Sequence, residues 1–112
     1  MKRNPRRDGQ KTAQLCAQVR EALSLALAGI ADDVILGLYV LDVTPAPDST
    51  RLRVQLGVSD DAEPDDVHER LDRYAGRLRN EVAGAIHRKK TPTLVYELMP
   101  RGLGPGPQNP GA

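Results

Sequence analysis

Residues 66–90 read DVHERLDRYAGRLRNEVAGAIHRKK, and this stretch decides the fold of the chain. Apolar residues recur in it every three or four positions, which predicts one apolar face of an α-helix. These residues are Val67, Leu71, Tyr74, Ala75, Leu78, Val82, Ala85 and Ile86. A glycine at Gly76 interrupts the run. Glycine costs about 1 kcal/mol relative to alanine inside a helix, and it permits a bend or a close backbone approach. We therefore predict two consecutive helices that join near Gly76 and share one apolar face.

The charge changes sign at the same place. Residues 60–72 are acidic, with Arg70 as their one cation, and their acids are Asp60, Asp61, Glu63, Asp65, Asp66, Glu69 and Asp72. Residues 73–90 are basic, with Glu81 as their one acid, and their cations are Arg73, Arg77, Arg79, Arg88, Lys89 and Lys90. The second helix is therefore predicted to be basic and to end in a basic cluster.

Composition limits the possible classes of protein. The chain has 112 residues, which predicts one domain, and it contains no Trp, no Phe and only three Tyr. Aromatic platforms for stacking bases are therefore nearly excluded. The net charge is only +1, so any contact with nucleic acid would come from local patches. The single cysteine, Cys16, excludes internal disulfides and zinc sites built from several cysteines.

No apolar run reaches the length that spans a membrane, and the N-terminal segment MKRNPRRDGQK has no apolar core of a signal peptide. We therefore expect a cytoplasmic, monomeric protein with no membrane partner. Residues 1–10 are predicted to be a flexible basic arm, which either binds phosphates or only aids solubility. Residues 99–112 are rich in Pro and Gly and are predicted to be a disordered tail.

Between these ends, residues 11–98 are predicted to form the domain. Apolar spacing predicts a helix over residues 11–30, with Cys16 as a small core residue. Residues 34–44 are apolar on both faces, which is typical of a strand in the middle of a sheet. Residues 51–59 alternate between apolar and polar residues and should pair with residues 34–44 as an antiparallel hairpin. Residues 93–98 should be a third strand. The order α-β-β-α-α-β predicts an α+β fold, a three-stranded sheet with helices on one face.

Catalytic chemistry is not indicated. His68 and His87 lack a histidine partner at the spacing of a zinc helix, so both are interpreted as surface or boundary residues. The adjacent acids, such as Asp32 and Asp33, lie at the ends of predicted elements, where helix capping explains them. We expect no metal, no cofactor and no enzymatic activity.

Two segments near the predicted helix pair carry a resemblance to a known family. Gly76-Arg77-Leu78-Arg79 and Lys90-Thr91-Pro92-Thr93-Leu94-Val95-Tyr96 are similar to the ribosome-binding factor A family, whose members are bacterial maturation factors of the small ribosomal subunit. The resemblance covers most of residues 11–98 and implies a KH-like fold of the second type. It also implies a helix kink at Tyr74, Ala75 and Gly76, with Tyr74 where the family has an alanine.

The resemblance implies a protein that binds small-subunit rRNA and assists late maturation of the small subunit, including rRNA processing. Its expected partners are the small ribosomal subunit, its rRNA and possible ribosomal-protein contacts. The candidate RNA-binding residues are Arg73, Arg77, Arg79, His87, Arg88, Lys89 and Lys90, whose cations would contact phosphates. The alternative is a non-enzymatic protein–protein interaction module that uses an apolar outer sheet face at Ile35, Tyr39 and Leu41. A solvated basic face without a partner also remains open.

Overall fold

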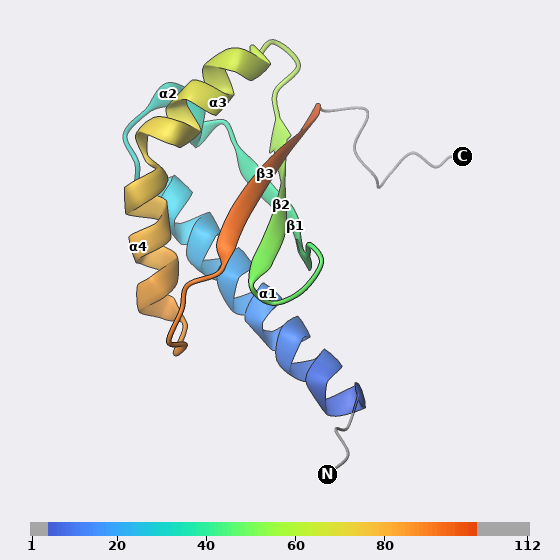
Figure 1. The fold of residues 1–112 in the computed structure, drawn as a ribbon. Helices are drawn as coiled ribbons and strands as arrows, with labels where there is room; N and C mark the ends of the chain where they lie inside the picture. The colour runs from blue at the N-terminus through green and yellow to red at the C-terminus, as the bar shows by residue number, and fades with distance from the viewer. Residues whose placement is uncertain (1–4, 101–112) are drawn as a thin grey trace, which may run out of the picture.

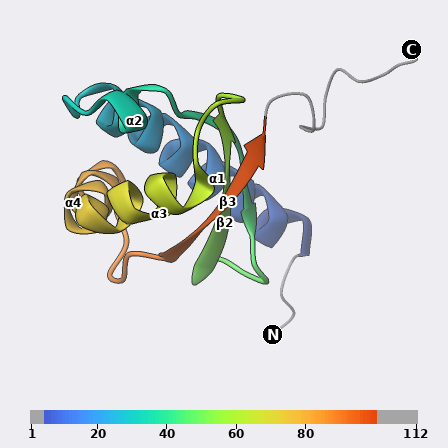
Figure 2. The ribbon, with the colours of Figure 1, turned by 90° about the horizontal axis from the view of Figure 1, so that it is seen from above.

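The structure is a computed structural model that describes residues 5–100 of the chain, and the side chains of residues 11–99. It has two layers, a three-stranded sheet and a layer of helices on one of its faces (Figures 1 and 2). The helices are α1 (Pro5–Ala28), α2 (Asp33–Leu36), α3 (Pro64–Arg73) and α4 (Ala75–Ala85). The strands are β1 (Tyr39–Pro45), β2 (Arg51–Val58) and β3 (Thr93–Pro100). None of the helices in the described part is long and apolar enough to cross a membrane.

The predicted α+β fold is confirmed, with the short helix α2 as an addition to the expected order. The sheet has the order β1-β2-β3. Strand β1 runs antiparallel to β2, as the predicted hairpin requires, and β3 runs parallel to β2. The helices α3 and α4 form the connection between these two parallel strands, as a crossover must. This arrangement of helices and strands is the one implied for a KH-like domain of the second type.

The core lies between the sheet and the helices. On β2 the inward residues Leu52, Val54 and Leu56 have no exposed surface, which confirms the predicted alternation of this strand. Leu23 of α1 and Leu78 of α4 are also fully buried and pack in the same cluster. Burying one such side chain contributes about 1.5–3 kcal/mol, so this one cluster supplies most of the apolar stabilisation. Cys16 belongs to it as predicted, with 8% of its surface exposed.

The prediction of a central strand over residues 34–44 is wrong in two respects. Residues 33–36 form the helix α2, because the carboxylate of Asp32 caps it by accepting the N–H groups of Val34 and Ile35. The strand begins only at Tyr39, and it lies at the sheet edge, since β3 takes the other side of β2. Ile35 is fully buried on α2, so it does not belong to an outer sheet face, whereas Tyr39 is 44% exposed.

The predicted ends of several elements also need correction. Helix α1 begins at Pro5, so the expected flexible arm is helical from that residue on, and proline fits the first turn of a helix because its missing N–H is not needed there. Strand β3 extends to Pro100, two residues into the expected tail. Residues 1–4 and 101–112, the rest of the arm and tail, lie outside the described residues.

Candidate nucleic-acid interface

The two predicted helices meet at Tyr74. Tyr74 is both the C-cap of α3 and the N-cap of α4, with φ −102° and ψ 10°. Its N–H donates to the carbonyl of Arg70 at 3.1 Å, and its own carbonyl accepts the N–H of Leu78 at 2.9 Å. The break is therefore two residues before Gly76, at the first residue of the kink that the resemblance implied at Tyr74, Ala75 and Gly76. Gly76 lies inside α4, and a Cβ added there would meet no atom within 4 Å, so this chain does not need the glycine for a close approach.

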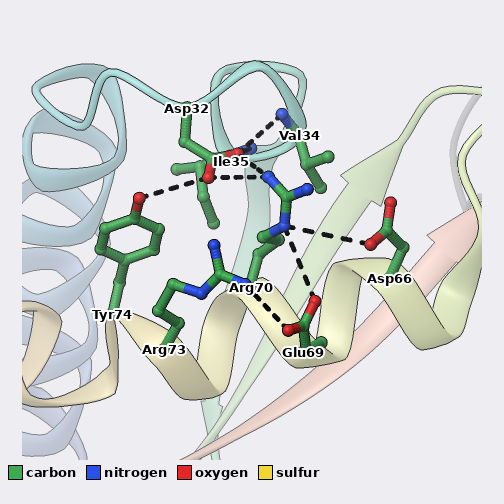
Figure 3. A network of polar contacts seen from close by, with 8 residues as sticks. All are labelled: Asp32, Val34, Ile35, Asp66, Glu69, Arg70, Arg73 and Tyr74. Atoms are coloured by element: carbon green, nitrogen blue, oxygen red, sulfur yellow. Dashed lines mark hydrogen bonds and ion pairs between the residues drawn. The ribbon is translucent and has the colours of Figure 1, made fainter.

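A buried carboxylate holds this junction in place (Figure 3). Asp32 accepts two hydrogen bonds from Nη1 of Arg70, at 2.9 and 2.8 Å, and one from the hydroxyl of Tyr74 at 3.2 Å. The same side chain caps α2 and is only 6% exposed. One carboxylate therefore ties α2, the last turn of α3 and the start of α4 together. The sequence indicated the capping role of Asp32 but not its bonds to Arg70 and Tyr74.

Opposing effects set the pKa of Asp32. Burial raises its pKa, but the hydrogen bonds from Ile35 N–H, Arg70 and Val34 N–H, together with the charge of Arg70, outweigh burial. The net result is a pKa below the ordinary value of 3.8. Asp32 is therefore ionised at neutral pH and stays paired with Arg70, which keeps the orientation of the junction fixed.

The three candidate cations near the junction differ in how free they are. Arg73 is paired with Glu69 one turn earlier, with Nη2 and Oε2 2.8 Å apart. Arg77 donates from Nη2 to the carbonyl of Gly29 at 3.1 Å and so links α4 to the end of α1. Arg79 is exposed and has no partner among the described residues. Arg73 and Arg77 each use one guanidinium nitrogen in these bonds and stay exposed, so Arg79 is the least constrained of the three for contact with a phosphate.

The remaining candidates are in a loop. Helix α4 ends at Ala85, and the next residue, Ile86, is extended and buried, with only 4% of its surface exposed. The prediction that the basic cluster ends the helix is therefore wrong, because anchoring Ile86 in the core turns the chain away before the cations are reached. These four residues, His87, Arg88, Lys89 and Lys90, form a basic loop. They are exposed and form no ion pair within the described part of the chain.

The candidate cations thus form two groups. Arg77 and Arg79 lie in the first half of α4 and the basic loop follows its end, so about 9 Å of helix, from Arg79 to Ala85, lies between Arg79 and the loop. Arg77 and Arg79 also point to different sides of α4, because residues two apart do not share a helix face. The surface is therefore an extended one, suited to successive phosphates of structured RNA rather than to a single anion.

The basic loop also borders a wide groove that the sequence did not reveal. Arg88 shares this groove, of about 1270 Å³, with Lys11 and Arg20 of α1 and with hairpin residues that include Pro45 and Pro47. Arg20 and Lys11 are exposed and were not predicted as site residues, because only the packing of α1 beside the hairpin brings them near Arg88. Glu21, Asp42 and Asp48 also line the groove, so their negative charges balance its cations. Arg88 belongs both to this groove and to the basic loop.

Nothing in the described residues forms a metal-binding cluster of His, Cys, Asp and Glu. His68 and His87 are both exposed, as predicted for surface histidines. The site therefore consists of exposed cations and the buried network that orients one group of them.

Comparisons with known proteins agree with the fold. No protein-family model matches the chain, and no curated relative matches it. Among solved structures, the chain is similar to the crystal structure of ribosome-binding factor A from Thermus thermophilus, with 24% sequence identity and a TM-score of 0.68. The similarity covers 84% of this chain and 99% of the other. The chain therefore has the fold of ribosome-binding factor A, which confirms the resemblance in fold drawn from its two short segments.

Proposed function

We propose that this chain binds the small ribosomal subunit through its rRNA and assists late maturation of that subunit, including processing of the rRNA. It would act in the cytoplasm, with the subunit as its partner and without a cofactor. Arg79 and the basic loop, residues 87–90, would supply the contacts, and Arg73 and Arg77 would add to them with the guanidinium nitrogens that do not bind Glu69 or the carbonyl of Gly29.

The observation that carries the proposal is the likeness in fold, over 99% of the other chain, to a protein named for binding the ribosome. The exposed cations support it independently. Arg79, Arg88, Lys89 and Lys90 have no partner among the described residues, so their charges are available to phosphates without the cost of breaking an ion pair. The absence of Trp and Phe agrees with recognition of RNA by backbone and shape rather than by base stacking.

The test in cells is a ribosome profile of a strain that lacks this gene. The proposal predicts accumulation of free small subunits that carry unprocessed rRNA, and restoration of the normal profile by the wild-type gene. A strain with a normal profile and fully processed rRNA would contradict the maturation role.

Matched charge variants then test the site. The variant Lys89→Glu/Lys90→Glu should fail to restore the profile. The control Arg51→Glu/Arg53→Glu makes the same change in net charge at exposed positions of β2, outside the candidate RNA-binding residues, and should restore it. Equal rescue by both variants, at equal protein levels, would remove the basic loop from the site.

A further inference from the structure

Strand β3 is an open edge of the sheet. It pairs only with β2 among the described strands, and its register runs without a shift from Thr93 to Pro100. The opposite edge strand, β1, has a bulge between Val40 and Asp42 and ends in Pro45, two devices that discourage further pairing. Strand β3 has no lysine, no bulge and no proline before its last residue. Its free edge therefore keeps the ability to pair with another strand (Figure 1).

The helices cover β3 incompletely. The inward residues Leu94, Tyr96 and Leu98 are only partly buried, although their direct neighbours on β2 are fully buried. These three side chains pack on the core on one side and still present apolar surface beside the open edge. An added strand could cover that surface and gain the apolar contacts that the chain itself does not supply.

A groove follows this strand. It has a volume of about 640 Å³ and lies between β3 and the start of α3, with Tyr96 and Leu98 on one side and Pro64 and His68 on the other. Ser59, Asp60 and Ala62 of the loop that follows β2 also line the groove. An edge strand beside a groove for alternate side chains is the arrangement that binds extended peptides by β-strand addition.

Charge identifies the kind of peptide. The loop and the first turn of α3 carry Asp60, Asp61, Glu63 and Asp65, which are exposed and form no ion pair within the described residues. The groove itself contains Arg53 and His68, against Asp60 and Glu97, and Glu97 already accepts a hydrogen bond from Gln55 at 2.9 Å. The rim is thus strongly acidic, which disfavours nucleic acid and attracts lysine and arginine.

We propose that the open edge of β3, with the groove between β3 and α3, binds an extended lysine- or arginine-rich segment of a partner protein, which adds to the sheet as a fourth strand. The backbone of the segment would pair with β3, its apolar side chains would cover Leu94, Tyr96 and Leu98, and its cations would face the acidic rim. The groove contains none of residues 87–90, so this proposal does not depend on the RNA-binding one.

The first test is a binding titration of the full chain with a labelled synthetic peptide that alternates lysine and valine. Hydrogen exchange of the bound protein should show protection concentrated at residues 94–99. The same peptide with its backbone nitrogens methylated at alternate residues keeps its side chains but cannot donate to the edge, and it should bind at least about tenfold more weakly. Equal binding of both peptides would overturn strand addition.

Variants of the rim test the choice of partner. Asp60→Lys/Asp61→Lys should weaken binding of the lysine–valine peptide about tenfold, whereas Asp72→Lys/Glu81→Lys, an equal charge change at exposed positions outside the groove, should leave it unchanged. Equal losses in both variants would overturn the role of the rim. Two other results would also overturn the proposal: protection of β3 by single-stranded RNA instead of the peptide, or protection that rises with protein concentration alone, which would make a second copy the occupant.

Discussion

Replacing Gly76 by alanine tests the structure of the helix junction. Gly76 lies inside α4, its φ is not in the left-handed region, and an added Cβ would meet no atom within 4 Å. Because Gly76 is in the first turn of α4, the variant Gly76→Ala should gain at most the interior difference in helix propensity, about 0.5–1 kcal/mol in the free energy of unfolding. For a chain of 112 residues this corresponds to a rise in Tm of about 2–6 °C.

The assay is urea unfolding followed by far-ultraviolet circular dichroism. The midpoint should move to higher urea with an unchanged m-value, which marks a change in stability without a change in compactness. Gly84→Ala is the matched control, because Gly84 also lies in α4 with nothing within 4 Å of an added Cβ. Gly57→Ala should behave differently, since its Cβ would overlap the ring of Tyr39 and force that ring to move.

The result that would refute the reasoning is a destabilised Gly76→Ala beside a stabilised Gly84→Ala. It would mean that the junction depends on the glycine at Gly76, as its position in the sequence first indicated, and not on the break at Tyr74. A stabilised Gly76→Ala that no longer binds small subunits would instead place the need for glycine at the contact with the subunit.

Three further predictions concern buried groups. Since the pKa of Asp32 is lowered on folding, its ionised form stabilises the fold above about pH 3.8, and this contribution is lost as the pH falls below that value. The difference in free energy of unfolding between wild type and Asp32→Asn should therefore shrink in acid. Urea unfolding at a series of pH values measures this difference. Leu78→Ala should lower the free energy of unfolding by about 2–5 kcal/mol, because Leu78 is fully buried, whereas the exposed Leu25→Ala should change it little. Burial, and to a smaller extent the charge of Asp42, raises the pKa of the Cys16 thiol. A disulfide reagent should therefore react with Cys16 far more slowly in the folded chain than in urea. Equal rates would contradict the place of Cys16 in the core.

The parts of the fold that the sequence predicted correctly are those with a long, unambiguous period. The alternation over Leu52, Val54 and Leu56 leaves one face to bury, and the helical spacing from Val67 to Val82 is sustained across both helices. The junction could be placed only to within two residues, because glycine signals a bend but does not fix where the hydrogen-bond pattern changes.

The errors arose where local signals compete. Residues 34–36 are all apolar, a pattern that fits a strand as well as a short helix. The N-cap bonds of Asp32, which Arg70 from a distant part of the chain holds in place, favour the helix. The candidate site shows the same limit. The resemblance and the basic segment together predicted seven RNA-binding residues. The bond from Arg77 to the carbonyl of Gly29 depends on the packing of α4 against α1, and no local pattern reveals it.

The central claim is that exposed cations after α4 hold the chain on the small ribosomal subunit, and co-sedimentation with purified small subunits over a range of salt concentrations tests it most directly. The account predicts that wild-type binding falls steeply with salt, that Lys89→Glu/Lys90→Glu binds weakly with a salt slope reduced by about 1.5–2, and that Arg51→Glu/Arg53→Glu binds like wild type. If the Lys89→Glu/Lys90→Glu variant is folded and binds with the affinity and salt slope of the wild type, the claim is contradicted.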